Sequence, residues 1–376
     1  MSTDANAVVE VDRAAPGATR LVESELEPLG EGQVRLRVDR YALTANNVTY
    51  AVMGDMLGYW DFFPADTARK WGRVPTMGWA DVVESAHPEV AAGGRYYGWF
   101  PMARFVDLTV SPTRDGLRDD GPHRQAHAPV YRSYVETGHD PWYPSVDGAA
   151  ADAGTAADEL GDDEDRHALL RGLFLTGLLA EAFFDDQGYL GAEAVVVLSA
   201  SSKTAIGFAQ RASERDVAVV GVTSAGNAEF VRSLGWYDEV VGYDDVGSLP
   251  LVPTVSVDMS GNGAALAALH GRLGDRLAYS MIIGNSHHDA PLAEVAVDPA
   301  PQFFFAPTEI GRRVEAWGRD EYDRRCHEAL DAFVAGSRRW LTVERTTGPA
   351  AAESAWHDAF HGAVPPSVGR IVSLHD

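Results

Sequence analysis

The segment that most constrains the fold is an apolar run that passes into a hydroxyl-rich turn and then into a helix-like pattern. It reads VVVLSASSKTAIG over residues 195–207. A buried strand, a tight turn and a helix form the layout of nucleotide-binding α/β proteins, where the fingerprint G-x-G-x-x-G lets the backbone approach a pyrophosphate. Here Ser202 and Thr204 stand at the first two glycine positions, and only Gly207 remains. The segment therefore predicts a strand, a turn and a helix in which the glycine turn is altered.

The turn contains one of the two lysines in the chain, Lys203; the other is Lys70. An ammonium group at a helix N-terminus, beside three hydroxyls, predicts an anion site. The alternative is a structural junction in which a serine or threonine caps the helix. A P-loop would need glycines at Val197 and Ser202, so we expect neither a kinase nor an NTPase. A hydrolase built on Ser199 and Lys203 would need an oxyanion hole, which the sequence does not reveal.

Length, charge and cysteine content set the broad class of the protein. A chain of 376 residues is long enough for two domains. The net charge of -24 argues against nucleic acid and anionic membranes as partners, because both need a basic surface. The single cysteine, Cys326, excludes an intramolecular disulfide and fits a reducing cytoplasm, and the N-terminal stretch has no secretory-signal pattern. Arg171 and Glu181 interrupt the apolar residues 168–184, which predicts a buried helix and not a membrane span.

The first part of the chain is expected to be β-rich. Between residues 7 and 110, strand-like runs at 33–38, 80–85 and 95–100 alternate with glycine and proline turns, which is typical of a barrel. Residues 111–165 contain acidic, low-complexity tracts and predict an exposed insertion or linker, although aromatic residues within them favour some packing. We expect a helix to begin near Glu164.

From residue 194 the pattern predicts a parallel sheet covered by helices on both faces, because short apolar strands alternate with helices. The expected strands are 195–198, 217–222, 239–241, 255–259 and 279–284. Residues 307–333 are expected to be helical, and 370–374 to form a closing strand. The predicted domains are residues 1–165, residues 166–330, and a C-terminal segment, 331–376, that returns to the first domain.

Several stretches carry a resemblance to a known superfamily. They are Arg40-Tyr41-Ala42-Leu43-Thr44-Ala45-Asn46-Asn47, residues 229–235, residues 239–243 and residues 369–374. On these the chain resembles the medium-chain dehydrogenase/reductase superfamily, in its zinc-free branch of quinone and enoyl reductases. Residues 75–83 and 199–204 resemble more closely an offshoot catalogued as a domain of unknown function. The resemblance implies a GroES-like β-rich barrel domain, a Rossmann-like parallel sheet domain of α/β class, and a homodimer.

The resemblance also implies that no metal takes part. Zinc-dependent relatives carry Gly-His-Glu where this chain has Gly78-Trp79-Ala80, and the four-cysteine lobe is missing. His287, His288 and Asp289 look like a metal cluster, but neighbouring side chains on an extended segment point in opposite directions. We therefore predict no metal ligands.

The cofactor implied is NADP, and the candidate cofactor-binding residues follow three strands. The turn after the first strand would bind the cofactor phosphates. The second strand ends without the acidic residue typical of NAD sites, so the residues after it would bind a 2′-phosphate. Tyr243 would contact the adenine, and the segment after residue 283 would line the nicotinamide pocket. Capping of the following helix is the alternative role for the second group. The candidates are Ser201, Ser202, Lys203, Thr204, Ala205, Thr223, Ser224, Asn227, Tyr243, Gly284, Asn285 and Ser286.

The candidate catalytic residues are Tyr59, Tyr50 and Asn47. Enoyl reductases have a tyrosine shortly after the asparagine that faces the cofactor, and Tyr59 is the nearest positional match. Hydride addition to an activated C=C leaves an enolate, which a phenol can stabilise and protonate. The alternative is that residues 59–63 form an apolar wall. The sequence thus predicts an NADPH-dependent reductase of an apolar enone or enoyl thioester, with a carbonyl or quinone reductase, or a non-catalytic binding module, as alternatives.

Overall fold

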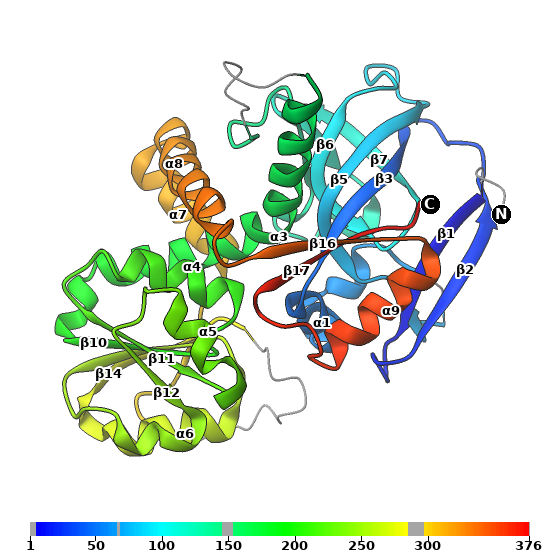
Figure 1. Ribbon diagram of the computed structural model, residues 1–376. Coiled ribbons are helices and arrows are strands. Elements are labelled where there is room, and N and C mark those ends of the chain that lie inside the picture. Colours follow the sequence, from blue (N-terminus) through cyan, green and yellow to red (C-terminus); the bar gives the residue numbers. More distant parts are fainter. Residues whose placement is uncertain (1–4, 66–67, 145–152, 285–296, 376) are drawn as a thin grey trace. The chain divides into compact units, whose positions relative to one another are not determined.

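The computed structural model describes residues 5–65, 68–144, 153–284 and 297–375. The chain divides into two compact units (Figure 1). The barrel unit comprises Met1–Leu169 and Leu341–Asp376, and the parallel-sheet unit comprises Leu170–Trp340.

The barrel unit is built on six antiparallel strands that close on themselves. The ring runs through β3 (Gln33–Leu43), β5 (Pro75–Ser85), β6 (Arg95–Pro101), β9 (Ser133–Glu136), β8 (Gly116–Asp119) and β7 (Phe105–Thr113). It closes because β3 pairs with β5 on one side and with β7 on the other. Alternate residues of β3, such as Val34, Leu36 and Val38, are buried, as the sequence pattern requires for a barrel wall. Closure leaves few unpaired strand edges.

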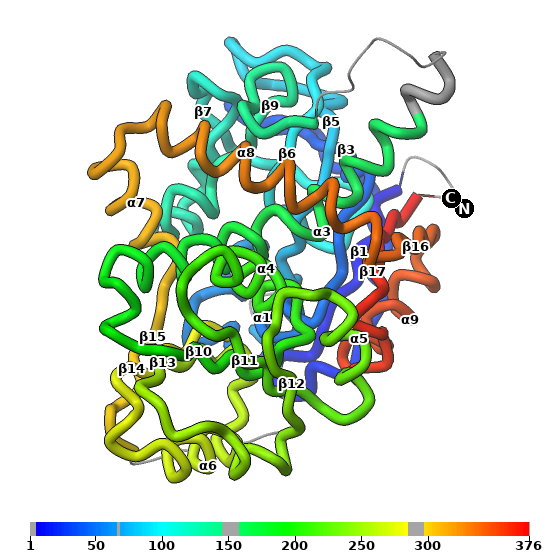
Figure 2. Tube along the Cα trace, turned by 60° about the vertical axis from the view of Figure 1, so that its left-hand side comes forward, coloured from blue at the N-terminus to red at the C-terminus, as the bar shows by residue number. Residues whose placement is uncertain are grey.

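From Leu341 onwards, the C-terminal segment belongs to the barrel unit. Strand β17 (Val368–Ser373) pairs with β3 and with β16 (Thr342–Thr347), and α9 (Pro349–Phe360) connects them. Both views of the chain place the red β17 beside the blue β3 (Figures 1 and 2). A small sheet of β2 (Thr19–Glu25), β1 (Ala5–Asp12) and β4 (Trp71–Gly72) completes the unit.

The parallel-sheet unit contains six parallel strands. Their order is β12 (Glu239–Gly242), β11 (Ala218–Thr223), β10 (Ala194–Leu198), β13 (Thr254–Asp258), β14 (Leu277–Ile282) and β15 (Gln302–Phe303). This is the doubly wound order, in which the direction of winding reverses between β10 and β13. Every residue of β10 and β13 is buried, which explains their continuous apolar runs.

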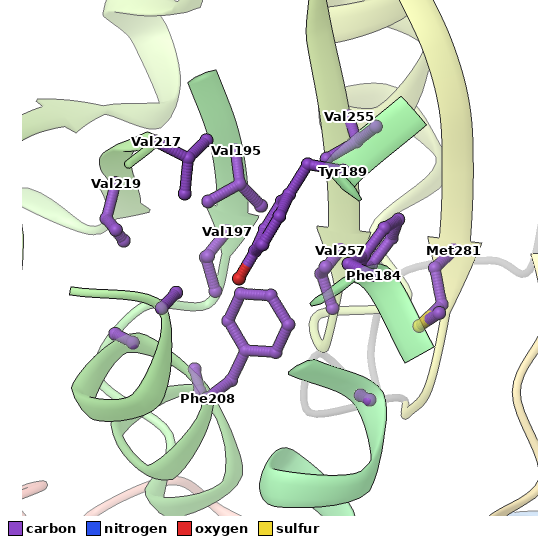
Figure 3. Close-up of a cluster of buried hydrophobic side chains, with 14 of the residues drawn as sticks. Phe184, Tyr189, Val195, Val197, Phe208, Val217, Val219, Val255, Val257 and Met281 are labelled. Carbon is purple, nitrogen blue, oxygen red and sulfur yellow. The ribbon is translucent and has the colours of Figure 1, made fainter. Parts of the chain in front are cut away.

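Helices cover both faces of this sheet. On one face, α4 (Lys203–Ala212) and the C-terminal part of α3 (Ala153–Asp185) pack on Val195, Val197 and Val257. Figure 3 shows Phe184, Phe208 and Tyr189 among these valines. On the other face, α6 (Gly263–Leu273) packs in a second cluster with Val196 and Leu198 of β10 and Val220 and Val222 of β11. The predicted α/β class, with a Rossmann-like sheet and a barrel, is confirmed.

The region predicted to be helical over 307–333 forms two helices. They are α7 (Ala306–Trp317) and α8 (Arg319–Ser337). Gly318 separates them with a φ of 79°, a conformation that glycine adopts without steric cost.

Helix α3 differs from the prediction, because it begins at Ala153 and not near Glu164. Alanine has the highest helix propensity, so this alanine-rich tract continues the helix. Near its middle, Glu164 and Asp165 are 5% and 0% exposed and ion-paired within the barrel unit, so this end of the tract is packed and not an exposed linker.

One helix of the described part of the chain is long and apolar enough to cross a membrane by composition. Its span, Asp158–Asp185, has a mean hydropathy of 1.3 over its most apolar window. However, 67% of that window is buried in the protein, and the helix includes Glu181, which forms an ion pair with Arg215 at 2.8 Å. These properties are typical of a core helix.

Candidate functional site

The hydroxyl-rich turn lies at the carboxyl end of β10, where the strand order reverses. Leu198 ends β10 beside Val222 of β11 and Asp258 of β13. In doubly wound sheets, ligands bind in the crevice that forms at this switch point. The turn therefore lies where the fold offers a binding site.

The glycine-like position of the turn is Ser199, not Ser202. Ser199 has a φ of 60°, in the left-handed region, whereas Ser202 has a φ of -72°. Ser202 is the N-cap of α4, and its hydroxyl accepts a hydrogen bond from the Ala205 N–H at 3.3 Å. The first glycine position of the fingerprint therefore corresponds to Ser199, three residues before the predicted Ser202. The place of Ser199 directly after the strand could have indicated this.

Lys203 is the first residue of α4 and is half-buried. Burial lowers the pKa of Lys203 to about 8. The charged form is therefore less favourable here than in water, and a bound phosphate would favour it strongly. Capping by Ser202 and anion binding by Lys203 are compatible, so the structure accommodates both sequence-based interpretations. Thr204 and Ala205 lie in the same first helical turn.

The residues predicted to hold a 2′-phosphate gather beside the turn. The Asn227 side-chain amide donates to the Ser201 hydroxyl at 3.1 Å, and the Thr223 hydroxyl lies 3.5 Å from the same oxygen. Ser224 is exposed at the following position. Although Ser224 and Asn227 occupy helix N-cap positions, neither makes a side-chain capping bond. Capping alone thus does not account for these two side chains.

Tyr243, which is predicted to contact an adenine, accepts a hydrogen bond from the Ser199 N–H with its hydroxyl at 3.1 Å. A second phenol, that of Tyr237, donates to the Ala200 carbonyl at 2.9 Å. Sequence inspection missed Tyr237, because nothing in the local pattern indicates which backbone group a phenol reaches.

A buried carboxylate, Asp258, was also missed. It is 1% exposed and accepts hydrogen bonds from the backbone N–H and the hydroxyl of Ser260, at 2.7 and 2.6 Å. Burial raises the pKa of Asp258. Its role is to hold the loop that follows β13 at the same edge of the sheet. In the sequence, its place as an acidic residue at the end of an apolar strand could have indicated this role.

The predicted nicotinamide segment is only partly described. Gly284 follows β14 at the carboxyl edge of the sheet, at the end of a described stretch. Asn285, Ser286, His287, His288 and Asp289 lie outside the described residues.

In the barrel unit, Asn47 has a structural role in α1 (Ala45–Val52). Its side-chain oxygen accepts from the Thr44 N–H at 2.8 Å, which forms a capping box, and its amide donates to the Pro75 carbonyl at 3.0 Å. Both ends of this buried amide are therefore engaged by the protein. The neighbouring Asn46 donates to the Tyr50 hydroxyl.

Tyr50 and Tyr59 lie together, as a shared catalytic role requires. Their ring centroids are 4.5 Å apart, and both side chains are buried. The Tyr59 hydroxyl, in the 3-10 helix η1 (Tyr59–Asp61), lies 3.4 Å from that of Tyr131, in η3 (Pro129–Tyr131). Trp99 packs on Tyr50 and on Tyr131, at 5.6 and 5.4 Å between centroids. Burial raises the pKa of Tyr50, Tyr59 and Tyr131, so these phenols stay neutral and carry a proton.

Tyr131 comes from the segment expected to be an insertion, and it was not among the predicted site residues. A buried ion pair holds this segment: Arg124 lies 3.1 Å from Asp119 and donates to the Tyr131 carbonyl. The Arg124 guanidinium also lies 4.0 Å from the ring centroid of Phe62. Only the tertiary fold brings residues 119–131 to the tyrosines.

Trp79 stands where zinc-dependent relatives have a histidine. Its indole N–H donates to the Glu164 carbonyl at 2.9 Å, and its ring packs on Tyr97 and Tyr143 at 5.1 and 5.6 Å. This position is therefore filled by a packed side chain. Within the described ranges, no group of three His, Cys, Asp or Glu side chains could hold a metal ion.

The sequence was compared with known families. The profile of the family described as "Protein of unknown function (DUF2855)" matches residues 41–365, which is most of the chain. The chain belongs to the DUF2855 family. A search of curated proteins found no match. The predicted offshoot of unknown function is thus confirmed.

Solved structures show where the DUF2855 fold belongs. CurA from Vibrio vulnificus is similar with a TM-score of 0.58 and 12% identity over 99% of each chain. The YhdH oxidoreductase from Salmonella enterica in complex with NADP has a TM-score of 0.52 and 15% identity, covering 98% of this chain and 99% of that chain. The Etr1p complex with NADP and crotonyl-CoA has a TM-score of 0.54 and 9% identity, with the same coverage. The chain shares the two-domain fold of these structures, as predicted.

Proposed function

We propose that this protein is an NADP-dependent oxidoreductase that reduces an activated C=C bond, in an enone or enoyl thioester, without a metal. The observation that carries the proposal is the lysine-bearing turn at the switch point of the parallel sheet. Support comes from similar structures: YhdH was solved with NADP, CurA with NADPH, and Etr1p with NADP and crotonyl-CoA.

The turn would hold the phosphates of the cofactor. Lys203 would supply a charge, and the first-turn N–H groups of α4 would supply donors at the positive end of the helix dipole. The cluster of Ser201, Thr223 and Asn227 would hold the 2′-phosphate, since it offers hydroxyl and amide donors and no carboxylate. These donor types fit a phosphate-bearing dinucleotide.

When bound, NADPH supplies a hydride. The contribution of the chain to the chemistry would be a proton, given to the substrate carbon by the Tyr59 hydroxyl. Tyr50 would donate a hydrogen bond to the developing enolate oxygen, which stabilises its charge. The apolar surroundings of these phenols, including Trp99, favour an apolar small molecule as substrate.

Two alternatives use the same residues. A carbonyl or quinone reductase would need the same cofactor turn and a phenol that protonates oxygen. A non-catalytic binding module would bind the nucleotide at the same turn but would not convert a substrate. We also propose that the protein is cytoplasmic and forms a homodimer. Sedimentation velocity of the purified protein checks the homodimer.

The test is a fluorescence titration with NADPH and NADH, followed by a panel of enones, enoyl thioesters, quinones and aldehydes. The proposal predicts saturable NADPH binding, weaker NADH binding, and oxidation of NADPH by an enone or enoyl thioester. Absence of binding of either nucleotide contradicts the reductase function. Binding without oxidation by any of these compounds favours the binding module.

A further inference from the structure

The turn between β10 and α4 is held by two phenols that flank β12. Tyr237 precedes the strand, and Tyr243 follows it. Tyr237 packs against the cluster that contains Val195 and Val197 of β10. Tyr243 packs against the cluster that contains Val196 and Leu198 of the same strand. Successive side chains of a strand point to opposite faces of the sheet. The two phenols therefore approach the turn from opposite faces.

Their hydroxyls contact three backbone groups of the turn. The Tyr243 oxygen accepts from the Ser199 N–H at 3.1 Å. The Tyr237 hydroxyl lies 2.9 Å from the Ala200 carbonyl oxygen and 3.2 Å from that of Ala205. These contacts link the start of the turn to the first turn of α4.

The backbone of the turn needs such support. Ser199 has a φ of 60°, a left-handed conformation that costs a residue with a Cβ about 1–2 kcal/mol. Glycine would adopt it without that cost, and glycine is the residue that nucleotide-binding turns ordinarily use.

Gly221 of β11 makes room for one of the phenols. A Cβ at this position would lie 2.8 Å from the Tyr237 ring and 3.0 Å from the Ala200 side chain. A side chain there would push Tyr237 away from the turn. The sequence thus places a glycine where the phenol passes, and a serine where glycine would be expected.

We propose that Tyr237 and Tyr243 are positioning residues that hold the Ser199–Ala205 backbone in its phosphate-accepting conformation, in place of the missing glycines. They act through the backbone and not by contact with the ligand. The inference rests on the proposed function only for the identity of that ligand.

The test combines hydrogen exchange of the ligand-free protein with NADPH titration. We expect Tyr237→Phe and Tyr243→Phe each to speed amide exchange in peptides covering residues 199–205 by about fivefold, as loss of one hydrogen bond implies. The NADPH dissociation constant should rise by a similar factor. Tyr279→Phe is the matched control, because Tyr279 pairs with Val255 near the start of β13 and packs on Phe183 and Phe184.

A double variant separates positioning from general destabilisation. In Ser199→Gly the left-handed conformation is free of strain, so adding Tyr243→Phe should weaken NADPH binding less than it does in the natural chain. Unchanged exchange over residues 199–205 in both phenylalanine variants overturns the inference. If the natural protein does not bind NADPH but exchange rises as expected, the proposed cofactor is wrong and the positioning role stands.

Discussion

The hydroxyls of Tyr59 and Tyr131 lie 3.4 Å apart, although 72 residues separate them in the chain. Both rings contact Phe62, at 5.5 and 5.4 Å between centroids. Burial raises the pKa of both phenols, so both are protonated near neutral pH. The pair can therefore give one proton and hold a second in reserve.

Tyr59→Phe should lower kcat for enone reduction by about 100-fold, because it removes the general acid and keeps the ring. NADPH affinity, measured by fluorescence titration, should stay the same. Tyr131→Phe is the matched control and should lower kcat by less than about tenfold, since this phenol acts through Tyr59. If Tyr59→Phe keeps the kcat of the natural protein, Tyr59 is not the general acid, and residues 59–63 form only an apolar wall.

NADPH binding should weaken above about pH 8. Burial lowers the pKa of Lys203 to about 8, so the free protein carries the ammonium below this pH and loses it above. Because a bound phosphate favours the ammonium, the dissociation constant should rise by up to tenfold per pH unit above 8 and change little from pH 7 to 8. Titrations from pH 7 to 9.5 measure this. Lys203→Arg should flatten the profile, since arginine stays charged; the same slope in that variant would assign the titration to another group.

Thr223→Asp should change the cofactor preference. A carboxylate at the end of the second strand accepts hydrogen bonds from ribose hydroxyls and repels a 2′-phosphate. We expect at least a tenfold loss of NADPH affinity together with a gain for NADH, roughly the effect of one charged hydrogen bond. Thr223→Val, which adds no charge, controls for packing. Equal losses for both nucleotides in Thr223→Asp would place the 2′-phosphate elsewhere.

Glu164 ties α3 to the barrel, and its loss should destabilise the barrel unit. Its carboxylate binds Arg95 at 2.8 Å and Arg40 at 2.5 Å, with the side chain 6% exposed. Glu164→Gln removes one buried anionic partner from each of the two guanidinium groups, so the free energy of unfolding in urea should fall by about 3 kcal/mol. Asp81→Asn removes a more exposed partner of Arg95 and should cost less than about 1 kcal/mol. If the two substitutions lowered the free energy of unfolding by similar amounts, burial of Glu164 would not strengthen its ion pairs.

The parallel sheet could be predicted because its strands are buried on both faces and read as apolar runs between helices. The same physics explains where prediction failed. An alanine- and aspartate-rich tract is compatible with a linker or a helix, and contacts of α3 such as Trp79 with Glu164 decide between them. Tyr50 and Tyr59 could be found because they are close in sequence. Tyr131 could not, because it is 72 residues from Tyr59 in the chain and only the tertiary fold brings the two together.

The turn shows the limit of motif alignment. Counting glycines placed the fingerprint at Ser202, while the backbone places the left-handed residue at Ser199. The compensating phenols lie 38 and 44 residues beyond Ser199, around another strand, and no local pattern connects them.

This turn is proposed to bind the phosphate of a dinucleotide through Lys203. The most direct measurement is the NADPH dissociation constant of Lys203→Ala beside that of the natural protein, with thermal unfolding as a check of the fold. We predict that the dissociation constant rises by about 10- to 100-fold, the range for loss of a charge-assisted hydrogen bond, with an unchanged melting temperature. An unchanged dissociation constant would contradict the account.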